Sequence, residues 1–151
     1  MNTSDLKIIG RREQVDLPEW DFYGLDAKID TGAFTSSLHC HDIETFKKEG
    51  ENWIRFYLLD PEHEAYNDRK IEKPIYDQRE VKSSNGETEL RYFIQTKINF
   101  FDGSYTIEFS LTDRSAMKYP LLIGRKFLKK GPFIVDVTST NSSKIKKTRE
   151  S

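Results

Sequence analysis

Cysteine is almost missing from this chain, since Cys40 is the only one in 151 residues. No disulfide can form within the chain, and nothing points to an oxidising compartment. No apolar run approaches the roughly 18 residues that a membrane helix needs. Residues 1–10 also lack the long apolar stretch of a signal peptide. We therefore expect a cytoplasmic protein that does not engage a membrane.

An excess of positive charge is also missing, with 24 Lys and Arg against 25 Asp and Glu. Dedicated nucleic-acid binders usually carry a basic excess, so we expect no nucleic-acid partner. Basic residues do gather near the C-terminus, but Ser and Thr separate them, and we interpret residues 138–151 as a disordered polar tail. Only 36% of residues are hydrophobic, so part of the chain is solvated or a partner subunit completes the apolar surface.

Strand signals dominate what remains. Apolar and polar residues alternate through 25–30 and 105–112, the pattern of half-buried strands. Further strands are expected at 53–59, 79–83, 87–91, 91–100 and 133–137. The dipeptides Asn85-Gly86 and Asp102-Gly103 predict hairpin turns between their neighbours.

Helical signals are slight: residues 125–130 fit one or two turns, which Gly131-Pro132 would end. The segment 61–74 is polar and weakly periodic, so we interpret it as a long connection or an insertion. These patterns predict a single all-β domain over residues 1–137, folded as a barrel or a sandwich.

Asp30-Thr31-Gly32-Ala33 is the first candidate for chemistry. An acidic residue at the end of a strand has a fixed position, and a following glycine lets other backbone approach closely. Taken alone the tetrapeptide is only moderately specific, because Asp-Thr-Gly also suits an ordinary turn.

The second candidate is the segment 119–128, in which an apolar strand runs into Gly124-Arg125 and a short apolar-faced helix. Together with Asp30-Thr31-Gly32-Ala33 it resembles the retropepsins, the small aspartic proteases that include the retroviral enzymes. The resemblance covers residues 29–137 and implies a closed β-barrel with one short C-terminal helix. It also implies a flap hairpin, which would correspond to residues 83–87.

A narrower resemblance rests on residues 9–13, 28–39, 111–115 and 122–125. These segments are similar to a bacterial family labelled ATP-dependent zinc protease and now grouped with the retropepsins. Its members are often associated with ATP-grasp ligases that add glutamate to proteins. The resemblance thus implies a functional link to such a ligase and suggests a glutamate-modified protein as substrate.

The number of catalytic carboxylates predicts the oligomer. Aspartic proteases need two carboxylates that share one proton, one to activate water and one to protonate the carbonyl oxygen. The chain has one Asp-Thr-Gly, and Asp136 lacks the Thr-Gly that should follow it. A two-fold homodimer would bring two copies of Asp30 together at its axis.

The resemblance also implies roles for individual residues. Asp30 would be the catalytic acid and base, and Thr31 would brace the two loops across the dimer. Gly32 would complete the catalytic loop and receive substrate backbone. The substrate-binding residues would be Ala33, Asn85, Gly86 and Ile123. Gly124 and Arg125 would be structural, but Phe34 stands where retroviral enzymes carry an Asp, so the partner of Arg125 is not given.

His39-Cys40-His41 raises the alternative of a zinc site, because His39 and His41 would point the same way in a strand. Zinc sites usually need three or four ligands, and His63 is the only other histidine, so we expect no metal. No Gly-rich loop is followed by Lys and Ser or Thr, and we expect no cofactor. Arg114 is an open candidate for holding an acidic substrate.

Two functions of different classes remain open. The first is a homodimeric aspartic endopeptidase that hydrolyses a peptide bound as an extended strand. The second is a retropepsin fold used as a peptide-binding or dimerisation module with little turnover, since fold does not fix function. A metal-dependent hydrolase is a weaker third reading.

Overall fold

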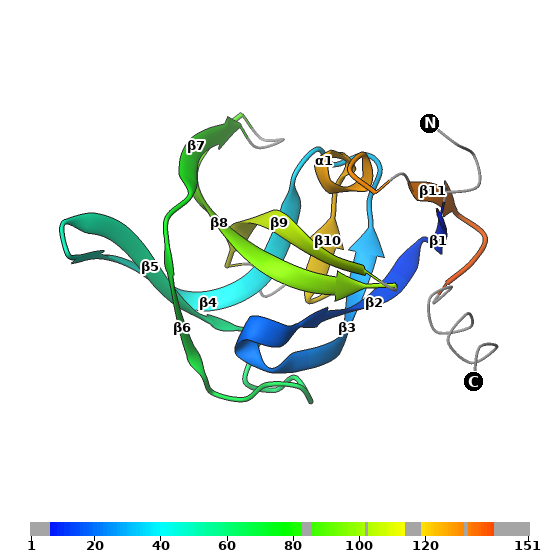
Figure 1. Ribbon diagram of the computed structural model, residues 1–151. Helices are drawn as coiled ribbons and strands as arrows, with labels where there is room; N and C mark the ends of the chain where they lie inside the picture. The colour runs from blue at the N-terminus through cyan, green and yellow to red at the C-terminus, as the bar shows by residue number, and fades with distance from the viewer. Residues whose placement is uncertain (1–6, 83–85, 102, 114–118, 132, 141–151) are drawn as a thin grey trace.

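The computed structural model describes residues 7–82, 86–101, 103–113, 119–131 and 133–140, and it is built almost entirely of strands (Figure 1). The elements are β1 (Lys7–Gly10), β2 (Arg12–Leu17), the 3-10 turn η2 (Pro18–Trp20), β3 (Phe22–Ile29), β4 (Ser36–Lys48), β5 (Glu51–Leu58), β6 (Lys70–Pro74), β7 (Asp77–Lys82), β8 (Thr88–Phe100), β9 (Gly103–Thr112), β10 (Leu121–Ile123), α1 (Arg125–Leu128) and β11 (Phe133–Asp136). The predicted all-β class with one short helix is confirmed.

Six strands form a ring in the order β10-β3-β2-β8-β9-β4. The ring is completed by β10, which pairs in parallel with β3 and antiparallel with β4. Although β10 is only three residues long, it is hydrogen-bonded through its backbone to both β3 and β4. The side chains of Leu121 and Ile123 are fully buried. The short strand that precedes Gly124 is therefore fixed on both sides.

Period-two alternation explains the strands that the sequence predicts. In β3, Leu25, Ala27 and Ile29 are buried while Asp26 and Lys28 are exposed. Side chains of a strand point alternately to its two faces, so one face of β3 enters the core. The same pattern places the buried apolar residues of β9 inside the ring.

The predicted strand set was incomplete. Strands β1, β2 and the long β4 were not among the predictions, and β6 lies within the segment 61–74 that we expected to be a connection or insertion. Of the five residues in β6, Ile71 alone is buried. A polar edge strand of this kind leaves almost no hydrophobic pattern, because its pairing with β5 depends on backbone hydrogen bonds.

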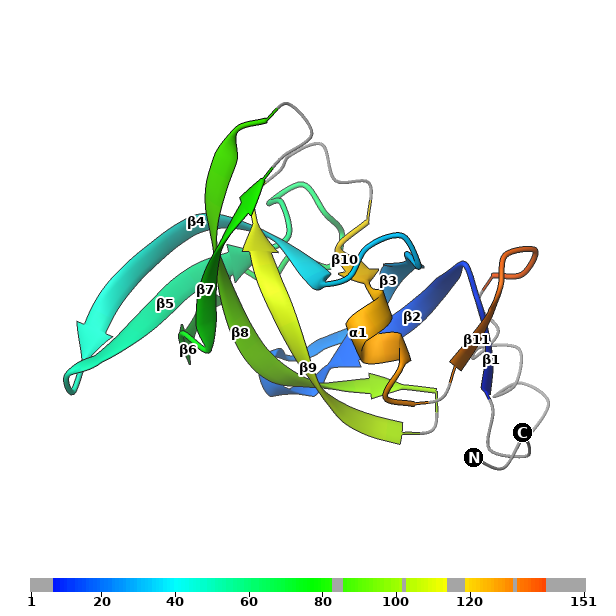
Figure 2. The same ribbon diagram turned by 90° about the horizontal axis from the view of Figure 1, so that it is seen from above.

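A separate two-stranded parallel sheet joins β1 to β11, at the end of the molecule away from the long β4–β5 hairpin (Figure 2). The chain after β11 packs back onto β1, where the Arg11 N–H donates to the carbonyl of Ser139 at 2.9 Å. Of the predicted polar tail, residues 141–151 lie outside the described residues. No helix in the described ranges is long and apolar enough to cross a membrane.

Candidate functional site

Asp30 lies immediately after β3, where the parallel strand β10 fixes the backbone. The Asp30 N–H donates to the carbonyl of Ile123 at 2.9 Å, which continues the β3–β10 ladder by one residue. The Asp30 side chain is half-buried, while Thr31 and Gly32 are exposed. A carboxylate is thus held at the surface on a backbone anchored from the core.

A tight turn orients this carboxylate. The Gly32 N–H donates to Asp30 Oδ1 at 2.9 Å, and the Ala33 N–H donates to the Asp30 carbonyl at 3.3 Å. A Cβ at Gly32 would lie 3.2 Å from Asp30 Oδ1, closer than ordinary van der Waals contact. Among the described residues, the hydrogen bonds of the Asp30 side chain involve Gly32 alone, which leaves Oδ2 available.

The Gly-Arg segment packs directly against the back of the turn. Gly124 has no room for a side chain, since a Cβ there would lie 2.6 Å from the carbonyl oxygen of Thr35 and 2.9 Å from that of Ala33. The Gly124 N–H donates to the buried hydroxyl of Ser36 at 2.9 Å. The Ser36 hydroxyl therefore links the Asp30-loop side of β4 to the Gly-Arg segment.

The first turn of α1 also binds the loop. The N–H groups of Arg125 and Lys126, which a helix leaves without internal partners, donate to the carbonyls of Ala33 and Phe34 at 2.8 and 3.0 Å. The loop therefore caps the helix, and the helix holds the loop.

Arg125 has a partner that the sequence did not reveal. Its Nη1 donates to the carbonyl of Thr31 at 3.0 Å. Its guanidinium also lies 5.8 Å from the ring centroid of Phe34, the residue in the place of the retroviral Asp. A backbone carbonyl and an aromatic face thus receive this arginine in place of a carboxylate.

The predicted substrate-binding residues do not all converge on Asp30 within one chain. The Ile123 side chain is fully buried in the core, and its carbonyl is the group that contacts the loop. Gly86 is exposed with φ +87° in the β7–β8 hairpin. Asn85 lies outside the described residues, as does Arg114. Ala33 is half-buried and gives its carbonyl to Arg125.

An ion-pair network connects this hairpin to α1. The carboxylate of Glu108 on β9 accepts hydrogen bonds from Arg79 on β7 and, at 2.7 Å, from Lys126 on α1. The Arg79 guanidinium also contacts Asp77, whose pKa is held below its usual value by that hydrogen bond. Sequence reasoning missed Glu108, although the alternation in β9 puts it on the polar face.

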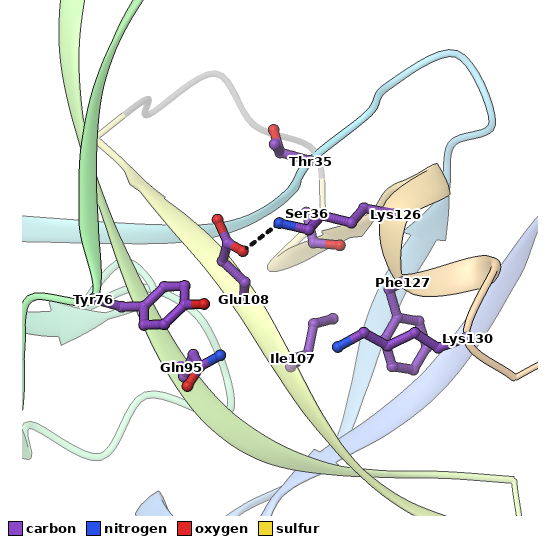
Figure 3. Close-up of a pocket in the computed structure, with 9 residues that line it drawn as sticks. All are labelled: Thr35, Ser36, Tyr76, Gln95, Ile107, Glu108, Lys126, Phe127 and Lys130. Atoms are coloured by element: carbon purple, nitrogen blue, oxygen red, sulfur yellow. Dashed lines mark hydrogen bonds and ion pairs between the residues drawn. The ribbon is translucent and has the colours of Figure 1, made fainter.

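A cleft of about 80 Å³ opens between the end of the Asp30 loop, α1 and the strands β8 and β9 (Figure 3). The Lys126 amine reaches across it to Glu108, and the Tyr76 ring stands on the far side. The residues that line the cleft are Thr35, Ser36, Tyr76, Gln95, Ile107, Glu108, Lys126, Phe127 and Lys130. The cleft is adjacent to the loop, and two of its lining residues, Lys126 and Lys130, are basic.

The histidines are held by protein groups. His39 Nε2 lies 3.1 Å from Asp60 Oδ1, and His41 Nδ1 lies 2.8 Å from the carbonyl of Leu59. No group of three or more His, Cys, Asp or Glu with metal-binding geometry occurs in the described part of the chain. Burial raises the pKa of the Cys40 thiol far above its usual value, so this group is an inert core residue.

Comparisons with known proteins agree with this architecture. The family model described as retropepsin-like aspartic endopeptidase RimB matches residues 8–146. A protein named Lpg0085 from Legionella pneumophila, of unknown function (DUF785), has a crystal structure similar to this chain. Its TM-score is 0.75 at 29% identity, over 91% of this chain and 98% of that one.

Curated relatives carry another name. Proteins called "Probable alpha-L-glutamate ligase" from Shewanella pealeana and Desulfotalea psychrophila are 41% and 36% identical over 79% and 80% of this chain. The match covers only 26% of each relative, so the chain corresponds to about a quarter of their length. With the matched family model covering nearly all of the described β-structure, the chain belongs to the RimB-like family of retropepsin-like aspartic endopeptidases.

Proposed function

We propose that the chain is one subunit of a homodimeric aspartic endopeptidase in which the two copies of Asp30 form the catalytic pair. The observation that carries the proposal is the double anchoring of the Asp30 turn, by β10 in front and by Gly124-Arg125 behind. Precise placement of a carboxylate is what general acid–base catalysis requires. In this proposal the ring of strands acts as the closed barrel of the retropepsins.

The reaction needs a second carboxylate, and one chain brings a single candidate. In the dimer, one Asp30 takes a proton from water as the water oxygen attacks the peptide carbonyl carbon. The other Asp30 gives its proton to the carbonyl oxygen, and collapse of the tetrahedral intermediate then breaks the C–N bond with proton transfer to the amine. Thr31, exposed beside the carboxylate, would contact its own copy across the axis.

The substrate in this proposal is an extended peptide in a glutamate-modified protein. Two observations support it: Lys126 and Lys130 line the cleft beside the loop, and the matched relatives are named as glutamate ligases. The proposal includes a functional partnership with an ATP-grasp ligase in the cytoplasm. Incubation of the chain with a protein before and after glutamate addition, followed by mass spectrometry, would test the preference.

The main experiment compares the unmodified chain with Asp30→Asn. The substitution keeps the size and the Oδ1 acceptor for Gly32 but removes the negative charge, so we expect at least about a thousandfold loss of peptide cleavage. Sedimentation velocity should show the same dimer for both proteins. Cleavage that survives in Asp30→Asn, or that a chelator abolishes, would exclude this mechanism.

The geometry of the dimer has its own test. A Thr31→Cys chain should form a disulfide with its own copy under mild oxidation, because two Cα atoms near a two-fold axis can come within about 7 Å. Cys40, the other cysteine in this variant, is fully buried, so we expect it to form no cross-link under the same conditions. Peptide binding without turnover, in a dimer that does not cross-link, would instead favour the binding-module alternative.

A further inference from the structure

Two consecutive arginines lie where β1 passes into β2, outside the cleft beside Asp30. Arg11 occupies the bend, and its backbone is held on both sides: its N–H donates to the Ser139 carbonyl and its carbonyl accepts from the Ile29 N–H, both at 2.9 Å. Arg12 is the first residue of β2 and pairs with Lys28 on β3. The backbone under both arginines is therefore fixed.

A cavity of about 390 Å³ lies over this bend. Its lining residues are Arg11, Arg12, Tyr119 and Thr140, which come from three separate parts of the chain. None of them lines the cleft of Figure 3. The volume is well above the roughly 30 Å³ share of one water molecule, so a small ion with its hydration fits.

No described residue compensates the charges of the two arginines that line this cavity. In the ranges that the structure describes, the side chains of Arg11 and Arg12 take part in no hydrogen bond or ion pair, and Arg12 Nε is buried without a partner. The cross-strand neighbour of Arg12 is Lys28, a third cation. Arg11 is exposed and Arg12 half-buried, so neither charge is withdrawn from solvent, and cations gathered at one place attract an anionic ligand.

We propose that Arg11 and Arg12 form a binding site for an oxyanion, a phosphate or carboxylate group. The planar guanidinium offers donors in a fork that matches two oxygens of either group, and it stays charged at all physiological pH values. A bound anion would join β2 to Tyr119 and to Thr140 after β11.

The site is tested by titrating the full-length chain separately with inorganic phosphate and with acetate, at constant ionic strength. Binding should raise the Tm by about 4 °C at tenfold saturation, because the ligand stabilises only the folded state. Amide chemical shifts should change around the bend at residues 10–12. Phosphate acting at lower concentration than acetate would identify a phosphoryl group, and the reverse order a carboxylate.

The matched variants are Arg12→Gln and Lys97→Gln. Lys97 is an exposed cation on β8 that does not line the cavity, so its loss should leave the affinity unchanged. Arg12→Gln should weaken binding at least about tenfold, since hydrogen bonds to charged groups are the strong ones. Arg12→Lys keeps the positive charge but removes the planar, two-pronged set of donors of the guanidinium. The folding of each variant is checked by circular dichroism.

Two results would overturn the proposal. One is the absence of any Tm or chemical-shift response to either anion at concentrations up to about 50 mM. The other is an equal response of the unmodified chain and of a folded Arg12→Gln chain, which would mean that the anion binds elsewhere. Both results leave the proposal for Asp30 untouched, because the two sites share no lining residue.

Discussion

Replacing Gly124 by alanine tests the contact on which the Asp30 turn depends. The backbone of Gly124 has φ −100° and ψ 178°, a conformation that alanine adopts without strain. Any effect must therefore come from the added methyl group, which would lie 2.6 Å from the Thr35 carbonyl oxygen. That is about 0.8 Å short of ordinary contact.

The neighbouring atoms cannot move cheaply to relieve this overlap. They are backbone carbonyls, and the Ala33 carbonyl is also held by the Arg125 N–H at 2.8 Å. Overpacking of a closed site costs typically 1–3 kcal/mol. Alanine returns about 0.4–1 kcal/mol through the unfolded chain. We therefore expect a net loss of about 1–2 kcal/mol in the free energy of unfolding.

Urea unfolding followed by tryptophan fluorescence measures this change, because Trp20 is buried and Trp53 half-buried. The matched control is Gly50→Ala, where nothing lies within 4 Å of the added Cβ but φ is +82°. The control should lose about 1 kcal/mol through backbone strain alone and leave the proposed peptidase activity unchanged. A Gly124→Ala chain as stable as the unmodified one would refute the close packing argued here.

Two further predictions concern charge. Glu108→Gln leaves the cations of Arg79 and Lys126 facing each other, so we expect a loss of about 1–2 kcal/mol and faster hydrogen exchange in β7, near the low end because both cations are partly exposed. Thr138→Ala removes the hydroxyl hydrogen bond that is the larger cause of the lowered pKa of Asp136, while the bond from the Thr138 backbone N–H remains. Because that pKa is depressed in the folded chain, the hydrogen bond stabilises the fold only while Asp136 is ionised. The variant should therefore be less stable than the unmodified chain at neutral pH, and this difference should disappear as the pH drops below about 4.

Each of these changes has a control with the same chemistry at an exposed place. Glu44→Gln breaks an exposed ion pair with Arg55 and should cost under about 0.5 kcal/mol. Thr106→Ala removes an exposed hydroxyl on β9, and its effect should not vary with pH between about 2 and 7. Equal losses in Glu108→Gln and Glu44→Gln, or a pH-independent effect of Thr138→Ala, would contradict the assigned roles.

The parts of the fold that the sequence predicted are those whose pattern is local. Alternation identified β3 and β9, and Asn85-Gly86 marked the β7–β8 hairpin, whose strands pair from Lys82 with Thr88 onward. Strand β1 escaped because it is four residues long and pairs with β11, more than a hundred residues away. In β2 the alternation is obscured by Glu13, an acid at a fully buried position, where its carboxylate accepts a hydrogen bond from the Gly10 N–H.

In the candidate site, too, some features follow from local motifs and others depend on contacts that the sequence does not reveal. The motifs placed Asp30 beside Gly124-Arg125 correctly, since the two segments together are specific. The acceptor for Arg125 could not be predicted, because a backbone carbonyl carries no residue identity. The role of Glu108 depends on which strands lie across from β9, and that is a property of topology.

The ring has one further consequence, which concerns the order of assembly. Asp30 belongs to the first quarter of the chain, but the carbonyl that anchors it, on Ile123, follows roughly ninety residues later. Contacts so distant in sequence form late in folding because of the entropy of closing the intervening loop. A growing chain would thus expose a loosely held carboxylate until β10 inserts between β3 and β4, and the anchored turn that the proposed dimeric site requires would form only in the finished ring.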